Sequence, residues 1–391
     1  AEALQVYTEL YNADALHGDR ESSLIPYNIA YCHFMSENYP LAMEWFSRYL
    51  ENGKVTYRKD ALERKGDCHF MIKEYKPASR VYDVVLKDYF DVNDIYPYYQ
   101  AALSYGLSGD REQKISLLEN VRNATVGVPY YSEALYELGR SYIGASQDDK
   151  AYECFELLSK NEKDCAFVAK AYLELGSIER NRNNLDSALA HYKVVVEQLP
   201  MSGHEEDALL AIENIYRAKK MSEEYVSYIE SIGKGESKTE EEKENLIFSS
   251  AEQVYLSDNY QKALTALKSY LEKYPGGRHL HKANFYMAES YRALDMKEQA
   301  CDCYEIVIEG GTSAFVEISM LNYSALSYKL ERWDDALRGY ASLYESAKLP
   351  NNAYLAMLGQ MRAAYRGHEW NTALGWVEEV LQKDSAEPQV K

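Results

Sequence analysis

The sequence predicts an all-α solenoid of about ten stacked helix–turn–helix repeats, and three observations lead to this prediction. Similar segments recur along the chain, alanine returns at a fixed interval, and apolar residues within each segment follow the period of an amphipathic helix. The recurrence is visible in YQKALTALKSYLEKYP (260–275) and LDSALAHYKVVVEQLP (185–200), which both have alanine at the fourth position and proline at the last.

Eight alanines mark the repeat and set its length. Successive members are 36 or 37 residues apart, or 73 or 75 residues apart where one repeat lacks the alanine. The eight are Ala42, Ala78, Ala151, Ala188, Ala263, Ala300, Ala336 and Ala373. Lys114 and Tyr225 occupy the two missing places, so the chain holds ten repeats with a period of 36–38 residues.

Two further columns place a pair of helices in each repeat. Twelve residues before the alanine position the residue is usually small, as at Gly66 and Gly139, and four residues after it the residue is apolar or aromatic, as at Tyr82 and Phe155. Both halves of a repeat carry apolar residues at helical spacing, and short stretches such as SENY, LSGD and NRNN separate them. We therefore expect a helical hairpin in which the small residue permits close approach and the large ring fills the space beside it.

In chain order, the pattern predicts one solenoid domain over 1–391. It comprises a half repeat at 1–16, ten repeats over about 23–383 and a short tail at 384–391. The one candidate linker, GKGESKTEEEKEN (233–245), does not interrupt the spacing, and its Thr239 and Glu242 predict a capping box at a helix start. Neither end shows a polar capping helix, so we expect a fragment of a longer array, with self-association through uncapped ends as a further expectation.

The composition excludes several classes of partner. The 391 residues carry a formal net charge of −19, which opposes binding to nucleic acid and to anionic membrane surfaces. No apolar run approaches the roughly 20 residues that a membrane-spanning helix needs, so no transmembrane segment is expected. The 37 tyrosines, against 9 phenylalanines, indicate many half-buried positions where a ring packs while its hydroxyl reaches water or a neighbour.

Few residues could support catalysis or metal binding, and their placement does not favour either. His33 and His69 stand in a column that holds tyrosine in four other repeats (Tyr105, Tyr142, Tyr216 and Tyr291) and is expected to pack between the helices of a hairpin. Cys301 and Cys303 are two residues apart on an expected helix, so their thiols point in nearly opposite directions. No GxSxG, HExxH or Walker A pattern appears in the context that it requires. We expect no enzyme activity, no metal site and no cofactor.

The order of small residue, tyrosine, turn, aromatic residue, alanine, aromatic residue and proline resembles the tetratricopeptide repeat. In the repeat from Asn284, the residues Ala288, Tyr291, Ala300, Tyr304 and Val307 fall on the family's pattern, and Pro200 and Pro275 match its closing proline. The period here is longer than the family's 34 residues. This resemblance implies a right-handed superhelix that acts as a non-catalytic protein-interaction scaffold, with the first helix of each pair lining a concave groove.

The longer period and the stretch YPGGRHLHKANFYMAESYRAL are also similar to repeats of bacterial periplasmic and outer-membrane-associated proteins. That second resemblance implies a periplasmic or outer-membrane-associated location in a Gram-negative bacterium, with the cytoplasm as the alternative.

The partner-binding prediction follows from the groove that the family resemblance implies. It comprises aromatic and cationic residues of the expected first helices: Tyr27, Tyr31, Phe34, Phe70, Tyr99, Tyr136, Arg140, Lys170, Arg180, Arg217, Arg292, Tyr328, Arg362 and Tyr365. Aromatic rings supply contact area and arginine holds carboxylates bidentately, so the expected partner is a protein or extended peptide with apolar and acidic residues.

Alternatives to this site and to this function stay open. Several of these residues could instead pack on the next repeat, with the arginines paired to glutamates of adjacent helices. Two other classes of function remain: a glycan-binding module that stacks sugars on the groove aromatics, and a homo-oligomeric structural scaffold.

Overall fold

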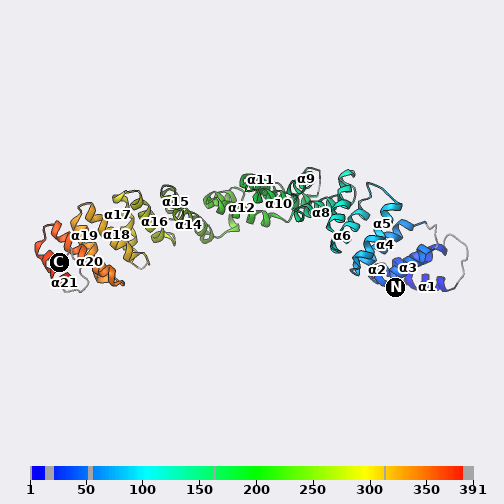
Figure 1. Ribbon diagram of the computed structural model, residues 1–391, viewed down its shortest axis with the longest axis horizontal. Helices are drawn as coiled ribbons and strands as arrows, with labels where there is room; N and C mark the ends of the chain where they lie inside the picture. The colour runs from blue at the N-terminus through cyan, green and yellow to red at the C-terminus, as the bar shows by residue number, and fades with distance from the viewer. Residues whose placement is uncertain (1, 14–21, 52–55, 162–163, 312–313, 382–391) are drawn as a thin grey trace. The chain divides into compact units, whose positions relative to one another are not determined.

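The fold is all-α, as predicted. The computed structural model describes residues 2–13, 22–51, 56–161, 164–311 and 314–381. Within these ranges the chain forms 21 α-helices, three short 3₁₀ turns and no β-strand (Figure 1). Two compact units, residues 1–212 and 213–391, are described one at a time.

The first unit begins with a single helix and continues as helix pairs. Its helices are α1 (Glu2–Asn12), α2 (Ile25–Met35), α3 (Tyr39–Glu51), α4 (Arg58–Met71), α5 (Tyr75–Asp88), α6 (Ile95–Leu107), α7 (Arg111–Glu119), α8 (Tyr131–Gly144), α9 (Asp148–Asn161), α10 (Cys165–Asn181) and α11 (Leu185–Gln198). The following helix, α12 (Glu205–Ala218), runs through the boundary at residue 212.

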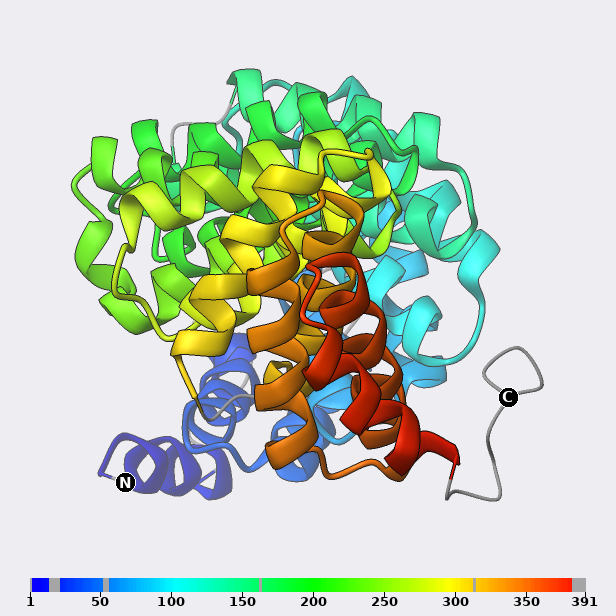
Figure 2. The same cartoon turned by 90° about the vertical axis from the view of Figure 1, so that its left-hand side faces the viewer.

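The second unit continues the same alternation. Its helices are α13 (Ser222–Ser231), α14 (Glu240–Leu256), α15 (Tyr260–Lys273), α16 (Leu280–Ala293), α17 (Lys297–Glu309), α18 (Val316–Lys329), α19 (Trp333–Ser346), α20 (Pro350–Arg366) and α21 (Trp370–Leu381). Figure 2 shows α16 to α21, coloured yellow to red, as successive rods lying side by side. Within each unit every helix contacts the next along the chain, as expected for stacked helix–turn–helix repeats.

The helix packing follows the columns of the repeat. All eight marker alanines are buried. A Cβ atom added to Gly139 would lie 2.6 Å from the Phe155 ring, and one added to Gly66 would lie 2.7 Å from the Tyr82 ring. The small column is therefore the point where the aromatic ring of the second helix rests directly on the backbone of the first helix, as the sequence predicted.

The turn inside each hairpin has one repeated geometry. In the described ranges, each of the ten hairpins has one residue with φ between +56° and +96° at this turn: Glu37, Lys73, Gly109, Ser146, Asn183, Lys220, Asp258, Asp295, Glu331 and His368. Two hydrogen bonds close the turn at Lys73. The Glu74 N–H donates to the His69 carbonyl at 2.8 Å, and the Lys73 N–H donates to the Phe70 carbonyl at 2.9 Å. These two bonds form a Schellman motif, which ends the first helix and starts the second within a few residues.

The segment 233–245 contains the 3₁₀ turn Gly235–Ser237 and the start of α14, which begins at Glu240. Thr239 caps α14, since the Glu242 N–H donates to its hydroxyl at 3.2 Å while the Thr239 N–H donates to the Glu242 carboxylate at 2.8 Å. This is the expected capping box. Separately, each helix in the described ranges is either too short or too polar to cross a lipid bilayer.

Candidate functional site

The first helices of successive repeats lie next to one another. In the first unit α2 contacts α4, α4 contacts α6, α6 contacts α8 and α8 contacts α10, and in the second unit α14 contacts α16 and α18 contacts α20. We call the surface formed by α2, α4, α6, α8 and α10 the first-helix face of the first unit. The predicted binding residues from Tyr27 to Arg180 belong to these five helices.

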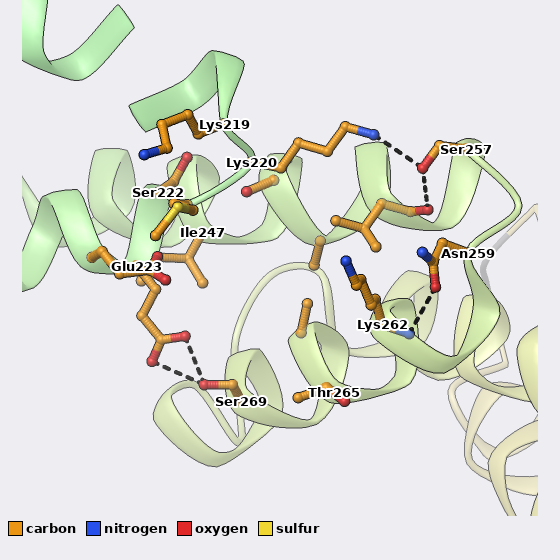
Figure 3. A pocket seen from close by; sticks show the side chains of 16 residues that line it. Lys219, Lys220, Ser222, Glu223, Ile247, Ser257, Asn259, Lys262, Thr265 and Ser269 are labelled. Carbon is orange, nitrogen blue, oxygen red and sulfur yellow. Dashed lines mark hydrogen bonds between the residues drawn. The ribbon is translucent and has the colours of Figure 1, made fainter. Parts of the chain in front are cut away.

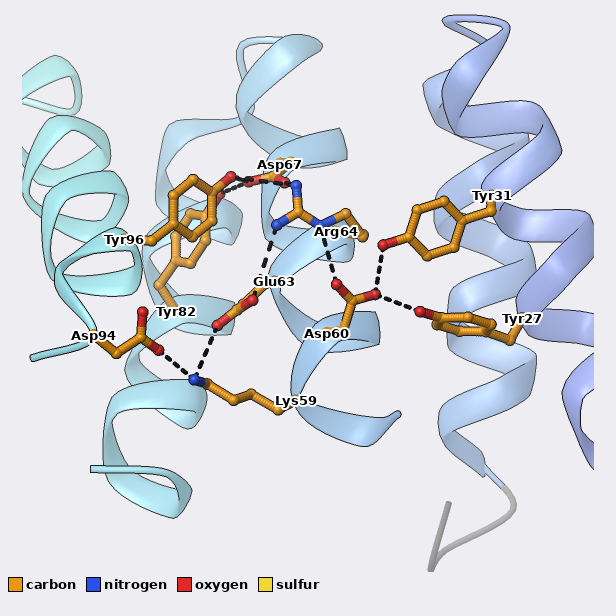
Figure 4. Close-up of polar contacts among 10 residues, drawn as sticks. All are labelled: Tyr27, Tyr31, Lys59, Asp60, Glu63, Arg64, Asp67, Tyr82, Asp94 and Tyr96. Carbon is orange, nitrogen blue, oxygen red and sulfur yellow. Dashed lines mark hydrogen bonds and ion pairs between the residues drawn. The ribbon is translucent and has the colours of Figure 1, made fainter. Parts of the chain in front are cut away.

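A polar network joins the first three repeats on this face (Figure 4). The hydroxyls of Tyr27 and Tyr31 both donate to Asp60 Oδ2 at 2.7 Å. Arg64 lies between Asp60 and Asp67, with Nε 3.6 Å from Asp60 Oδ1 and Nη1 paired with Asp67. The predicted residues Tyr27 and Tyr31 therefore contact the next repeat. This agrees with the alternative that several of the predicted binding residues pack on the next repeat.

The same network continues to the third repeat through Asp67. This buried carboxylate accepts hydrogen bonds from the hydroxyls of Tyr82 and Tyr96 and pairs with Arg64. Burial raises the pKa of Asp67, because desolvation disfavours the charged form. Nearby, burial raises the pKa of Glu63 to about 7, although Lys59 and Arg64 act in the opposite direction.

Carboxylates form equivalent links further along both units. Glu174 accepts from the Tyr136 hydroxyl at 3.0 Å and from Arg140 Nη1 at 2.7 Å. In the second unit, Glu289 accepts from the amide of Asn322 at 2.9 Å and from the hydroxyl of Tyr304. Arg140 and Glu289, each one position after the small column, thus connect successive repeats.

The remaining predicted aromatic residues pack against other rings. Phe34 contacts Tyr39 edge-on at 5.9 Å between ring centroids, Phe70 contacts Tyr75 at 5.4 Å, and Tyr99 stacks on Tyr130 at 6.1 Å. In the second unit, Tyr328 contacts Trp333 at 5.0 Å. Tyr365 contacts Trp370 at 5.4 Å and is exposed.

The predicted arginines are exposed and Lys170 is half-buried, and several of these cations pair with acids of their own repeat or of the next one. Arg140 pairs with Glu174 of the next repeat, whereas Arg217 and Arg292 pair with Glu213 and Glu289 of their own helices. Lys170 Nζ lies 4.9 Å from the centre of the Phe167 ring. Arg180 and Arg362 are exposed. On the first-helix face of the first unit, the predicted cations therefore lie on α8 and α10, whereas Lys59 and Arg64 of α4 belong to the polar network.

Cavities mark the two repeats that lack the alanine. A cavity of about 550 Å³ lies against α6, α7 and α8, beside Lys114. Another, of about 640 Å³, lies against α13, α14 and α15 next to the sixth repeat, where Tyr225 replaces alanine (Figure 3). Its lining combines Lys220 and Lys262 with hydroxyl groups such as Ser257.

Cys301, Cys303 and His279 occupy packed positions in the fold. Cys301 and Cys303 are both buried, and burial raises the pKa of the Cys303 thiol to about 12, which suppresses the reactive thiolate. His279 stacks on Phe248 with 4.1 Å between ring centroids, and its Nε2 lies 2.7 Å from the Asn245 side-chain oxygen. In the described ranges, no three of the His, Cys, Asp and Glu side chains are grouped so that they could hold a metal ion.

Comparisons with known proteins agree with the repeat pattern. The family model described as the tetratricopeptide repeat matches residues 133–164 and 282–309. These segments correspond to the hairpins α8–α9 and α16–α17. No curated protein matches the chain.

Several solved structures are similar to the chain at low sequence identity. The Naa15/Naa10 complex bound to HypK-THB is 14% identical with a TM-score of 0.43, over 99% of this chain and 61% of that one. A tetratricopeptide repeat protein from Parabacteroides merdae ATCC 43184 is 14% identical with a TM-score of 0.40, over 78% of this chain and 98% of that one. MamA is 17% identical with a TM-score of 0.37, over 48% of this chain and 95% of that one.

Proposed function

The chain is a tetratricopeptide-repeat protein, and on that premise we propose that it is a non-catalytic protein-interaction scaffold. The first-helix face of the first unit binds an extended peptide or protein segment that carries apolar and acidic residues. Stacked repeats suit this role because they present the same columns of side chains over a long surface.

The observation that carries this proposal is a cluster of two exposed arginines and one half-buried lysine on an acidic chain. Arg140 on α8 and Lys170 and Arg180 on α10 lie on neighbouring first helices, while the whole chain has a net charge of −19. The Arg140 side chain stays 54% exposed although it pairs with Glu174. A guanidinium in this position can exchange a surface ion pair, which contributes little to stability, for a bidentate bond to a partner carboxylate.

The packing of the aromatic residues favours protein over glycan as the ligand. Tyr27 and Tyr31 contact each other with 4.9 Å between ring centroids, and both donate their hydroxyls to Asp60. Sugar stacking needs an open ring face, and these rings instead face one another and the next repeat.

The test is a selection of displayed peptides against the purified chain, followed by affinity measurement of the selected peptides. We expect enriched peptides that combine acidic and apolar residues, and a tenfold or greater loss of affinity in the Lys170→Glu/Arg180→Glu double variant. Arg48→Glu, which changes an exposed arginine on the second helix α3, is the matched control. Failure to enrich any peptide, or equal affinity for the double variant and the control, would exclude the proposed function.

A further inference from the structure

An exposed apolar stripe runs along one edge of the first unit. Met35, Met71 and Leu107 are the last residues of α2, α4 and α6 and are spaced 36 residues apart. Their exposed fractions are 77%, 53% and 56%. We call these three residues the apolar edge. Large apolar side chains repeated at one exposed position along a repeat array are typical of an interaction surface.

The apolar edge ends at a cationic cavity. Leu107 is part of the lining of the 550 Å³ cavity, together with Arg111 and Ile115 of α7 and Arg140 of α8. Lys114 also reaches this cavity and pairs with Glu137. The cavity lining thus combines apolar side chains with the exposed guanidinium groups of Arg111 and Arg140 and the carboxylate of Glu137.

Lys114, which replaces the marker alanine, is part of the cavity lining. A Cβ on Gly106 would lie 2.7 Å from Lys114 Cδ, so the lysine occupies the space between the helices and glycine is needed beside it. Arg111 lies in the first turn of α7, where the helix dipole disfavours a cation and favours an anion. The Asp110 carboxylate already caps this helix end by accepting from the Gln113 N–H at 3.0 Å, so a bound carboxylate would be stabilised by Arg111.

We propose that the apolar edge and its cavity dock an extended segment of a partner protein, with regularly spaced apolar residues followed by carboxylates. Packed helices lie about 8–10 Å apart, and a polyproline-type chain advances about 3.1 Å per residue with three residues per turn. Every third residue of such a segment would therefore meet the next apolar residue of the edge, and the carboxylates that follow would reach Arg111 and Arg140. This inference rests on the proposed scaffold function and specifies its partner chemistry and location.

The probe is a fluorescein-labelled synthetic peptide with leucine at every third position and two aspartates after the last leucine. Its binding to the full chain is followed by fluorescence anisotropy, with a scrambled peptide of the same composition as the ligand control. We expect the ordered peptide to bind more tightly than the scrambled one. Met71→Asp and Arg111→Glu should each weaken binding tenfold or more, and added salt should weaken it as well.

Matched variants separate this edge from other exposed residues. Phe90→Asp changes an apolar residue of the same unit that is 72% exposed and not on the edge, and Arg48→Glu changes an exposed arginine of α3, so both should bind like the wild type. Thermal melts confirm that each variant is folded.

The outcomes distinguish this inference from the scaffold proposal. If the ordered peptide binds no better than the scrambled one, or if Met71→Asp and Arg111→Glu bind like their controls, the inference is overturned. In that case, displayed peptides that depend on Lys170 and Arg180 would still support the scaffold. If peptide selection also fails, both proposals fall.

Discussion

At the scale of single residues, tyrosine hydroxyls paired with carboxylates explain an unusual composition. Tyr105 donates to Asp83 at 2.6 Å and Tyr270 donates to Glu244 at 2.8 Å, in the same manner as the pairs at Asp67. Hydrogen bonds to an ionised acceptor are stronger than neutral ones. Part of the acidic excess is therefore structural, because these carboxylates hold tyrosines between helices as well as contacting solvent.

Glu63 gives a pH-dependent prediction. Burial raises its pKa to about 7, so the folded state binds an extra proton between the ordinary value of 4.5 and pH 7. The stability that this proton contributes is present at low pH and is lost as the pH rises through 7. We expect Glu63→Gln to become more stable relative to the wild type between pH 5 and pH 8, by an amount on the order of 1 kcal/mol after solvent screening.

Urea denaturation followed by circular dichroism at both pH values measures this change. Glu44→Gln, on an exposed glutamate of α3, is the control. A constant difference between Glu63→Gln and the wild type at pH 5 and pH 8 would show that this carboxyl does not titrate in that range.

Two substitutions at the left-handed turn position are expected to change the stability of the fold in opposite directions. Lys73 has φ of 66°, a region that costs a residue with a side chain roughly 1 kcal/mol or more, whereas Gly109 holds the equivalent place without that cost. We expect Lys73→Gly to stabilise the fold by roughly 0.5–1 kcal/mol and Gly109→Ala to destabilise it by about 1 kcal/mol. No atom lies within 4 Å of a Cβ at Gly109, so its effect would be conformational. Denaturation midpoints that move in the same direction would contradict this account.

At the scale of elements, the small column sets how closely the two helices of a hairpin approach. Gly139 lets the Phe155 ring rest on the α8 backbone, whereas the first repeat has Ala30 and Phe46 in the same columns. In the hairpin of the fourth repeat, α8 and α9 therefore pack closely because the residue between them, Gly139, has no side chain.

Gly139→Ala should destabilise the fold by about 1–2 kcal/mol, because the new methyl group lies 2.6 Å from the Phe155 ring and must displace it. Gly144 of the same helix has no atom within 4 Å of an added Cβ, so Gly144→Ala should be neutral or slightly stabilising. Thermal denaturation of the two variants measures the difference. If both alanines have the same effect, helix propensity rather than packing determines this position.

The repeat pattern predicts the elements better than it predicts the site. Ala42 and Gly66 reveal the hairpin because each must fit against its own partner helix, and that constraint recurs every 36–38 residues. The link from Arg140 to Glu174 depends on the offset between neighbouring repeats, which no single repeat encodes. The exposure of Met71 could not be predicted either, because an apolar residue at a helix end is equally compatible with burial.

At the scale of the whole molecule, stability should vary along the array. In a repeat protein, stability is approximately the sum of the repeats and of the contacts between neighbours. The third and sixth repeats have second helices of only 9 and 10 residues, α7 and α13, whereas α9 and α17 have 14 and 13. Both short helices belong to repeats in which Lys114 or Tyr225 replaces the marker alanine, and both lie beside cavities.

Hydrogen exchange measured by mass spectrometry tests where the array opens first. We expect the amides of α7 and α13 to exchange at least tenfold faster than those of α9 and α17, because a short helix with fewer packed neighbours opens locally at lower free energy. Glu213→Gln should accelerate exchange in α13 further, since Glu213 is buried and pairs with Lys238 at 2.9 Å, and Glu298→Gln on α17 serves as the control. Uniform protection along all four helices would mean that the repeats unfold as one cooperative block, and the two missing alanines would then have no energetic consequence.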